Sequence, residues 1–177
     1  RWNFGRIILE NIFDAGFDRD KLFVIRDGEN DASGVRCVPN LRALPDPLDL
    51  FIVAIGAEQV PPLVDEIIEN NAAHSVMLIP GGLGETEESR EMTGRRIARI
   101  TEAHKNRAAG GDGGPAFLGA NCMGVISRPG KFDTWFIPAA KMPDYKQYPR
   151  RRTAIVSQRG AFLLNRFSQT PEMSPSY

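Results

Sequence analysis

A short apolar run followed by a glycine-rich turn constrains this chain more than any other feature. Residues 76–79 are Val, Met, Leu and Ile, and residues 80–84 contain three glycines. Consecutive apolar residues between turn residues predict a parallel strand that is buried on both faces. Gly81, Gly82 and Gly84 allow a left-handed backbone, or let a ligand lie against bare backbone. We therefore predict a strand that leads into a ligand-binding turn.

The helix that follows this turn indicates what kind of ligand group the turn accepts. Thr86 is a suitable N-cap, and Glu87 and Glu88 lie in the predicted first turn, where the helix dipole favours acids. These carboxylates would repel a phosphate. We expect a neutral, hydrogen-bonding ligand group here, with Glu85 as an acceptor for an amide or a hydroxyl, and any polyphosphate elsewhere.

Strands and helices alternate along the first part of the chain. We predict a helix over residues 5–16, strands over residues 22–25, 49–55 and 116–118, and helices after Pro61 and over residues 87–105. Short connections between them predict an α/β fold with a doubly wound parallel sheet. Because such a domain normally begins with a strand, we expect a first strand upstream of Arg1.

Three turns should meet at one edge of this sheet. One is formed by Gly56, Ala57 and Glu58, one covers residues 81–86, and one covers residues 121–124. Each follows a predicted strand, and the carboxyl ends of parallel strands share one edge, where ligands bind in such folds. Convergence of these turns is the main functional inference from pattern alone.

The periodic pattern stops near residue 137 and resumes at residue 153. Prolines interrupt residues 138–152, which we interpret as a linker between a domain over residues 1–137 and a second α/β domain that starts at residues 153–177. Residues 153–157 are predicted as its first strand and residues 161–167 as the start of a helix.

Composition excludes several classes of function. Formal net charge is zero, so the basic surface of a nucleic-acid-binding protein is missing. No apolar run approaches the roughly 20 residues that a membrane span needs. Cys37 and Cys122 lack C-x-x-C spacing, and we expect no metal site and a reducing, cytoplasmic setting. No histidine or lysine flanks Cys122, which argues against a nucleophilic cysteine.

Four stretches together resemble the NDP-forming (ADP-forming) acyl-CoA synthetases, the superfamily of the succinyl-CoA ligase α subunit. They cover residues 49–61, 81–86, 119–126 and 155–161, in that order. The resemblance implies a Rossmann-like CoA-binding domain followed by a flavodoxin-like domain. It also implies an acid–thiol ligase that acts through a phosphohistidine beyond residue 153, with ATP or ADP bound by an ATP-grasp domain or subunit. On that reading this chain carries no catalytic residue and is inactive alone.

The same resemblance assigns roles to residues of this chain. It implies that coenzyme A contacts the backbone of all three turns. Arg26 ends a predicted strand that faces the adenosine in Rossmann-like sites, and it is either a solvated residue or a partner for the adenosine phosphates. Phosphate-binding candidates are Ser157, Arg159 and Gly160, although Arg159 stands where the family usually has serine. The implied CoA-binding residues are Arg26, Gly56, Ala57, Glu58, Gly81, Gly82, Gly84, Glu85, Asn121, Cys122 and Gly124.

Two alternatives remain open at this point. The first is a CoA-sensing or acyl-CoA-sensing regulatory module without catalysis, since Arg159 departs from the family pattern. The second is a Rossmann domain for a nicotinamide cofactor, which needs a G-x-G-x-x-G motif after the first strand. For either reading or for the synthetase, we expect a homo-oligomer that binds neither nucleic acid nor membrane.

Overall fold

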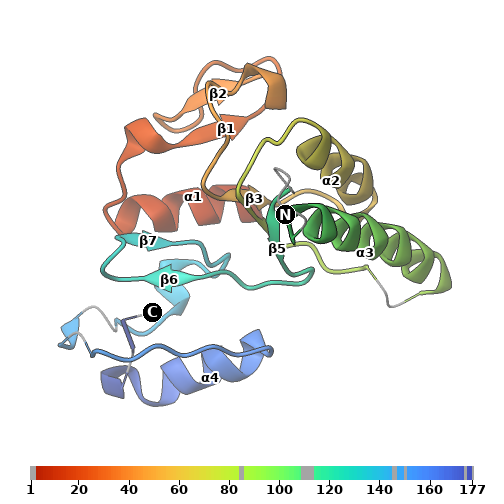
Figure 1. The fold of residues 1–177 in the computed structure, drawn as a ribbon. Helices are drawn as coiled ribbons and strands as arrows, with labels where there is room; N and C mark the ends of the chain where they lie inside the picture. Colours follow the sequence, from red (N-terminus) through yellow and green to blue (C-terminus); the bar gives the residue numbers. More distant parts are fainter. Residues whose placement is uncertain are drawn as a thin grey trace. The chain divides into compact units, whose positions relative to one another are not determined.

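The computed structural model describes residues 3–83, 86–108, 114–144, 147–149, 151–173 and 175–176. It consists of two compact units (Figure 1). The sheet unit is Arg19–Cys122, and the hairpin unit combines Arg1–Asp18 with Met123–Tyr177.

The helices and strands follow the chain in an order that mixes both units. The helices are α1 (Phe4–Asp14), α2 (Val60–Glu69), α3 (Glu87–Ala108) and α4 (Gly160–Gln169). The strands are β1 (Phe23–Ile25), β2 (Arg36–Val38), β3 (Phe51–Val53), β4 (Ser75–Leu78), β5 (Ala116–Leu118), β6 (Ile126–Ser127) and β7 (Phe132–Asp133).

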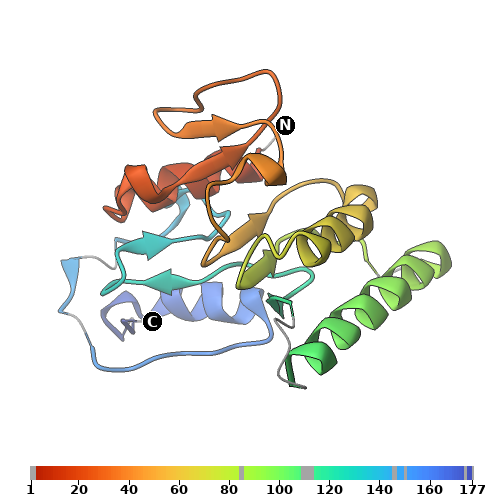
Figure 2. The same cartoon turned by 45° about the horizontal axis from the view of Figure 1, so that its top comes forward.

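The sheet unit is built on parallel strands, as predicted. β3, β4 and β5 form one sheet with β4 in the centre, and Val76 of β4 lies opposite Phe51 and Phe117 of its neighbours (Figures 1 and 2). β1 and β2 form a separate parallel pair. Parallel strands with helical crossovers confirm the predicted α/β fold with a parallel sheet.

Apolar periodicity explains how α2 covers this sheet. Val60, Val64 and Ile67 recur at helical spacing and are fully buried against the central strand, whose Val76 and Leu78 are also buried. Pro61 and Pro62 lie in the first turn of α2, where missing amide hydrogens cost nothing. Helix α3 packs beside α2 (Figure 2).

The start of α3 carries the predicted cap. The amide of Ser89 donates a hydrogen bond to Thr86 Oγ1 at 3.1 Å, and the amide of Thr86 donates to Ser89 Oγ at 2.8 Å. This is a reciprocal capping box with serine in the place of the usual glutamate. Farther along, the Arg99 guanidinium lies 2.7 Å from Asp65 of α2, which ties the two helices together.

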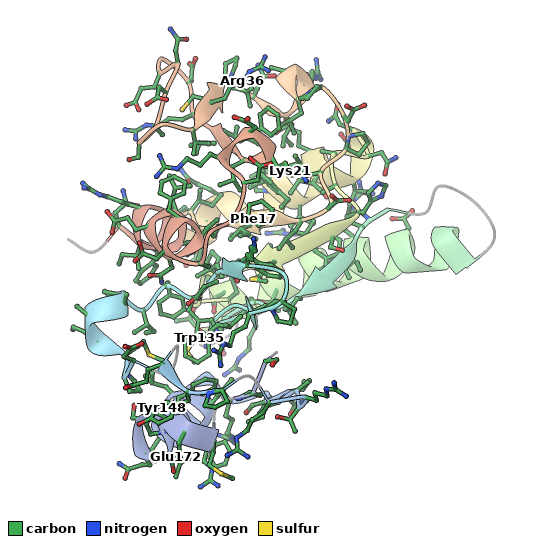
Figure 3. The ribbon with its side chains drawn as sticks, turned by 90° about the vertical axis from the view of Figure 1, so that its left-hand side faces the viewer. Phe17, Lys21, Arg36, Trp135, Tyr148 and Glu172 are labelled. Atoms are coloured by element: carbon green, nitrogen blue, oxygen red, sulfur yellow. The ribbon has the colours of Figure 1, made fainter. Side chains whose placement is uncertain are left out.

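The hairpin unit has its own small core. β6 and β7 form an antiparallel pair. The Trp135 ring, which is labelled in Figure 3, packs edge-on against Phe167 of α4 with 5.5 Å between the ring centroids. Asn11 of α1 donates hydrogen bonds to the carbonyls of Trp135 and Ile137, at 2.7 and 2.8 Å. Trp135 therefore anchors both helices of this unit.

Some local predictions were wrong. β2 was not predicted, and β3 covers three residues where seven were expected. Residues 153–157 are not a strand, because a strand requires a ladder of hydrogen bonds to a neighbour. The described residues supply a bridge between Arg151 and Pro175 beside them and one bond from the Ser176 amide to the Thr153 carbonyl at 3.0 Å. The predicted linker includes Met142, which packs against the Trp135 core. The predicted domain limits themselves stay a prediction.

Among the described residues, no helix combines the length and the apolar character needed to cross a bilayer.

Candidate functional site

The predicted glycine turn lies at the carboxyl end of the buried central strand β4. Pro80, Gly81 and Gly82 follow this strand, and Gly82 has a φ of +80°. That left-handed conformation favours glycine, as the sequence predicted. Gly84 and Glu85, the other predicted members of the turn, lie outside the described residues.

The three predicted turns meet at this end of the sheet. The Asn121 amide donates a hydrogen bond to the Pro80 carbonyl at 2.9 Å. A Cβ added to Gly81 would lie 3.3 Å from Asn121 Oδ1, and one added to Gly82 would lie 3.7 Å from the Ala57 Cβ. We call this contact group of Ala57, Gly81, Gly82 and Asn121 the rim. Its existence confirms the expected convergence of segments that are far apart in sequence.

The turn after β5 is held close to the central strand. Gly119 has a φ of +98°, and a Cβ there would lie only 2.5 Å from the Leu78 carbonyl oxygen. The Cys122 amide donates to that same carbonyl at 3.2 Å. Asn121 adopts a φ of +53°, a conformation that asparagine tolerates better than most residues. Only glycine allows the backbone approach that places Asn121 on the rim.

Charge at these strand ends is mixed. The Glu58 carboxylate occupies the space that a Cβ on Gly56 would need, so this acid lies against the turn after β3. Glu87 and Glu88 lie in the first turn of α3. Arg26, at the end of β1, is exposed and pairs with Glu29 at 3.0 Å. The Glu58 carboxylate, next to Ala57 of the rim in sequence, disfavours a phosphate there, and Arg26 is the cation that the sequence analysis assigned to phosphate.

The two cysteines differ in environment. Cys37 is buried in β2, and burial, followed by the nearby Glu29 and Asp31 carboxylates, raises the pKa of its thiol. Cys122 is half-buried beside the rim. The nearby Arg26 guanidinium opposes this effect on the pKa of Cys37 but is the smallest of its causes. The described residues contain no group of three or more side chains suited to hold a metal ion.

The predicted phosphate-binding residues lie in the hairpin unit. Helix α4 begins at Gly160, and Ser157 Oγ accepts a hydrogen bond from the Arg159 amide at 3.2 Å just before it. Gly160 packs against Met123, since a Cβ there would lie 2.7 Å from the methionine Cε. Gly124 also belongs to this unit, so the structure groups neither it nor the three phosphate candidates with the rim.

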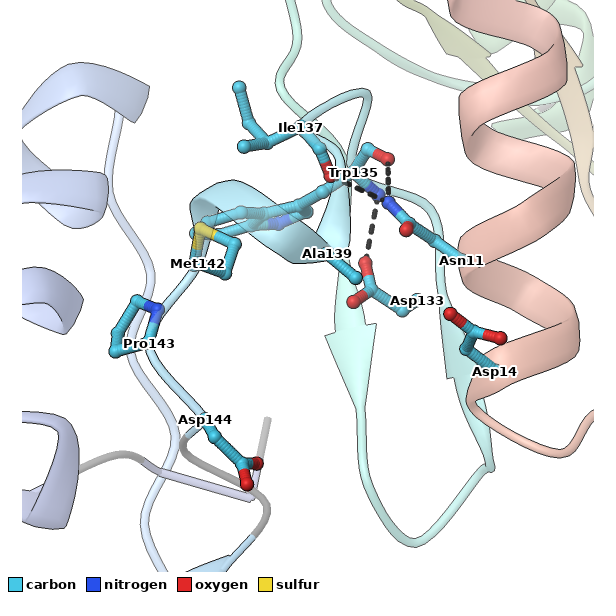
Figure 4. A pocket seen from close by; sticks show the side chains of 9 residues that line it. All are labelled: Asn11, Asp14, Asp133, Trp135, Ile137, Ala139, Met142, Pro143 and Asp144. Carbon is cyan, nitrogen blue, oxygen red and sulfur yellow. Dashed lines mark hydrogen bonds between the residues drawn. The ribbon is translucent and has the colours of Figure 1, made fainter.

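The hairpin unit also contains a cavity that sequence reasoning missed. It has a volume of about 230 Å³ and is lined in part by Asn11, Trp135 and the three acids Asp14, Asp133 and Asp144 (Figure 4). Asp133 accepts a hydrogen bond from the Trp135 amide at 3.0 Å. Acids around the cavity make it unsuited to a polyphosphate. Its residues come from two distant stretches, residues 11–14 and 133–144, so no local motif could have indicated it.

Comparisons with known sequences assign a family to most of the chain. Residues 2–128 match the family described as CoA binding domain. The ADP-forming acetate–CoA ligase II α subunit of Pyrococcus furiosus is 26% identical over 141 residues, which cover 80% of this chain and 27% of that protein. The ADP-forming acetate–CoA ligase II of Archaeoglobus fulgidus is 26% identical over 156 residues, 88% of this chain and 21% of that protein. The chain thus spans about a quarter of the relatives' length.

Solved structures show the same fold. A Pyrococcus horikoshii OT3 protein of known crystal structure matches with a TM-score of 0.74 and 21% identity, over 96% of this chain and 34% of its own. The dinucleotide-forming acetyl-coenzyme A synthetase 1 of Ca. Korarchaeum cryptofilum, in complex with phosphate and ADP, matches with a TM-score of 0.69 and 23% identity. That match covers 94% of this chain and 32% of the synthetase.

Proposed function

We propose that this chain, which belongs to the CoA-binding domain family over residues 2–128, binds coenzyme A through the rim of its sheet unit. One observation carries the choice of site: Gly81 lies against Asn121, and Gly82 lies against Ala57, at the carboxyl end of a buried parallel strand. Ligands of doubly wound folds bind at this edge.

The chemistry of the rim fits the pantetheine arm of coenzyme A. This arm is neutral, and its amides both donate and accept hydrogen bonds. Gly81 and Gly82 present backbone without side chains, and Asn121 adds an amide group with both donors and an acceptor. The carboxylate of Glu58 suits an amide or hydroxyl donor and opposes a phosphate. We therefore place pantetheine, and not the diphosphate, on the rim.

The phosphates of coenzyme A need a cation elsewhere. Arg26 is exposed at the carboxyl end of β1, and its present partner Glu29 is also exposed, so the pair separates at little cost. We assign Arg26 to the adenosine phosphates. Ser157, Arg159 and Gly160 precede and begin α4, where first-turn amides favour an anion, and we keep them as candidates for a phosphoryl group.

We further propose that the whole protein is an ADP-forming acid–thiol ligase. In this proposal the present chain supplies coenzyme A affinity, while ATP or ADP binds to an ATP-grasp domain or subunit and a phosphohistidine outside these residues carries the phosphoryl group. The acetate–CoA ligases among its relatives support this assignment. A homo-oligomer and a cytoplasmic setting belong to the same proposal. No observation favours the sensing module or the nicotinamide domain.

Calorimetric titration with coenzyme A tests the site when wild type is compared with Gly81→Ala and Gly94→Ala. The new methyl at Gly81 would press on Asn121 Oδ1, whereas nothing lies within 4 Å of Gly94 in α3. Losing one rim hydrogen bond should weaken binding about fivefold for Gly81→Ala, and Gly94→Ala should bind like wild type. Absence of heat and of thermal shift at millimolar coenzyme A would overturn the proposal, and so would displacement of coenzyme A by NADH.

A further inference from the structure

The cavity of the hairpin unit is walled mainly by groups that accept hydrogen bonds. Its polar lining consists of the Asn11 side chain, the carboxylates of Asp14, Asp133 and Asp144, and the indole of Trp135 (Figure 4). Asn11 and Asp14 are three positions apart in α1 and therefore share one face of that helix. All of these residues belong to the same compact unit, and none of the described lining residues is a lysine, an arginine or a histidine.

Asn11 shows which way the polar groups face. It is only 5% exposed, and its Nδ2 donates to the carbonyls of Trp135 and Ile137, which uses both hydrogens of the amide nitrogen. Its Oδ1 accepts no hydrogen bond from any residue that the structure describes. Figure 4 shows this oxygen turned away from the two carbonyls, on the side of the Asp133 carboxylate. A buried acceptor in such a place calls for a donor, which a ligand can supply.

The carboxylates indicate that this donor should be a cation. Three acids around one small cavity create a negative potential there, which attracts positive charge and opposes an anion. Lys141 ends the short helix Ala139–Lys141, but it is not one of the residues that line the cavity. The positive charge that the described lining lacks would therefore come from a bound ligand.

The arrangement suits an organic cation better than a metal ion. A metal ion needs several oxygen ligands that converge on one point, and the described residues hold no group of three or more side chains suited to that. The rest of the lining is apolar and includes Ile137, Met142 and Pro143. At about 230 Å³ the cavity is smaller than the roughly 300–1,000 Å³ of pockets for drug-sized ligands. Separated acids and an apolar wall fit a small ion with an alkyl body.

We propose that this cavity is a binding site for a small alkylammonium ion. Its ammonium group donates to Asn11 Oδ1 and is attracted by the acids around it, while its alkyl part packs against Trp135 and Met142. Charge-assisted hydrogen bonds of this kind are stronger than bonds between neutral groups. The inference does not rest on coenzyme A binding, because the cavity belongs to the hairpin unit and the rim to the sheet unit.

Tryptophan fluorescence tests the site with butylammonium as the probe. The chain has two tryptophans, so Trp2→Phe leaves Trp135 as the only reporter. At constant ionic strength, we expect butylammonium to change the Trp135 emission with half-saturation near about 1 mM, a typical affinity for so small a ligand. Sodium ions and neutral n-butanol should cause no saturable change. Absence of saturation with butylammonium, or an equal response to n-butanol, would overturn the proposal. A response to Mg²⁺ with none to butylammonium would overturn it as well.

Replacing acids by amides of the same shape separates charge from packing. Asp14→Asn and Asp144→Asn each remove one exposed carboxylate from the lining, and each should weaken butylammonium binding about two- to fivefold, the range of an exposed ion pair. Glu172 is an exposed acid of the same unit that does not line the cavity, so Glu172→Gln should bind like wild type. An equal loss in Glu172→Gln would indicate attraction to the surface in general and would overturn the site. If either cavity variant fails to fold, the comparison of butylammonium with n-butanol on the Trp2→Phe chain decides.

Discussion

Replacing Gly119 by alanine tests whether backbone contact with β4 places the rim. Two costs follow from the structure. A φ of +98° strains any residue with a Cβ, by about 1–3 kcal/mol. The added Cβ would also lie 2.5 Å from the Leu78 carbonyl oxygen, which is backbone and cannot rotate away. Relieving that clash breaks the hydrogen bond from the Cys122 amide to Leu78, worth about 1 kcal/mol.

Together these costs predict that Gly119→Ala lowers the free energy of unfolding by about 2–4 kcal/mol, measured by urea denaturation. Two glycines of the same unit separate the causes. Gly28 has a φ of +77° with nothing within 4 Å, so Gly28→Ala carries the strain without the clash. Exposed Gly94 within α3 carries neither, and Gly94→Ala should stabilise by up to about 1 kcal/mol. The reasoning is refuted if Gly119→Ala destabilises no more than Gly28→Ala.

Two further predictions concern buried side chains. Because burial raises the pKa of Cys37, alkylation by iodoacetamide at mildly alkaline pH should be slower at Cys37 than at half-buried Cys122. Equal alkylation rates would contradict the raised pKa of the Cys37 thiol. The folded state binds the Cys37 proton more tightly than the unfolded state, so this contribution to stability is present below the ordinary thiol pKa and is lost as pH rises through the raised value. Trp135→Ala should lower the free energy of unfolding of the hairpin unit by about 3–5 kcal/mol, measured by chemical denaturation. A decrease below about 1 kcal/mol, which is typical of a surface substitution, would show that the Trp135–Phe167 contact is not the core of this unit.

Features encoded by local pattern could be predicted from the sequence. The apolar run at residues 76–79 indicated a central strand, and the spacing of Val60, Val64 and Ile67 indicated the buried face of α2. Convergence at the rim followed from topology, because parallel strands present their carboxyl ends at the same edge. The cap at Thr86 was also predictable, since threonine precedes an acidic first turn.

Features that depend on distant partners could not be predicted. Arg36 to Val38 form a strand only because β1 supplies its hydrogen bonds, and three residues carry no periodicity of their own. Residues 153–157 show the opposite case: Val156 belongs to a convincing apolar run, yet it is 98% exposed and unpaired with a neighbouring strand in the described part of the chain.

Coenzyme A titration followed by two-dimensional amide NMR tests the central claim most directly. The account predicts that the amide signals of Ala57, Gly82 and Asn121 shift together with one saturation curve, while the Gly94 amide in α3 does not move. Saturable shifts confined to residues around Trp135 in the hairpin unit, with the three rim amides unchanged, would contradict it.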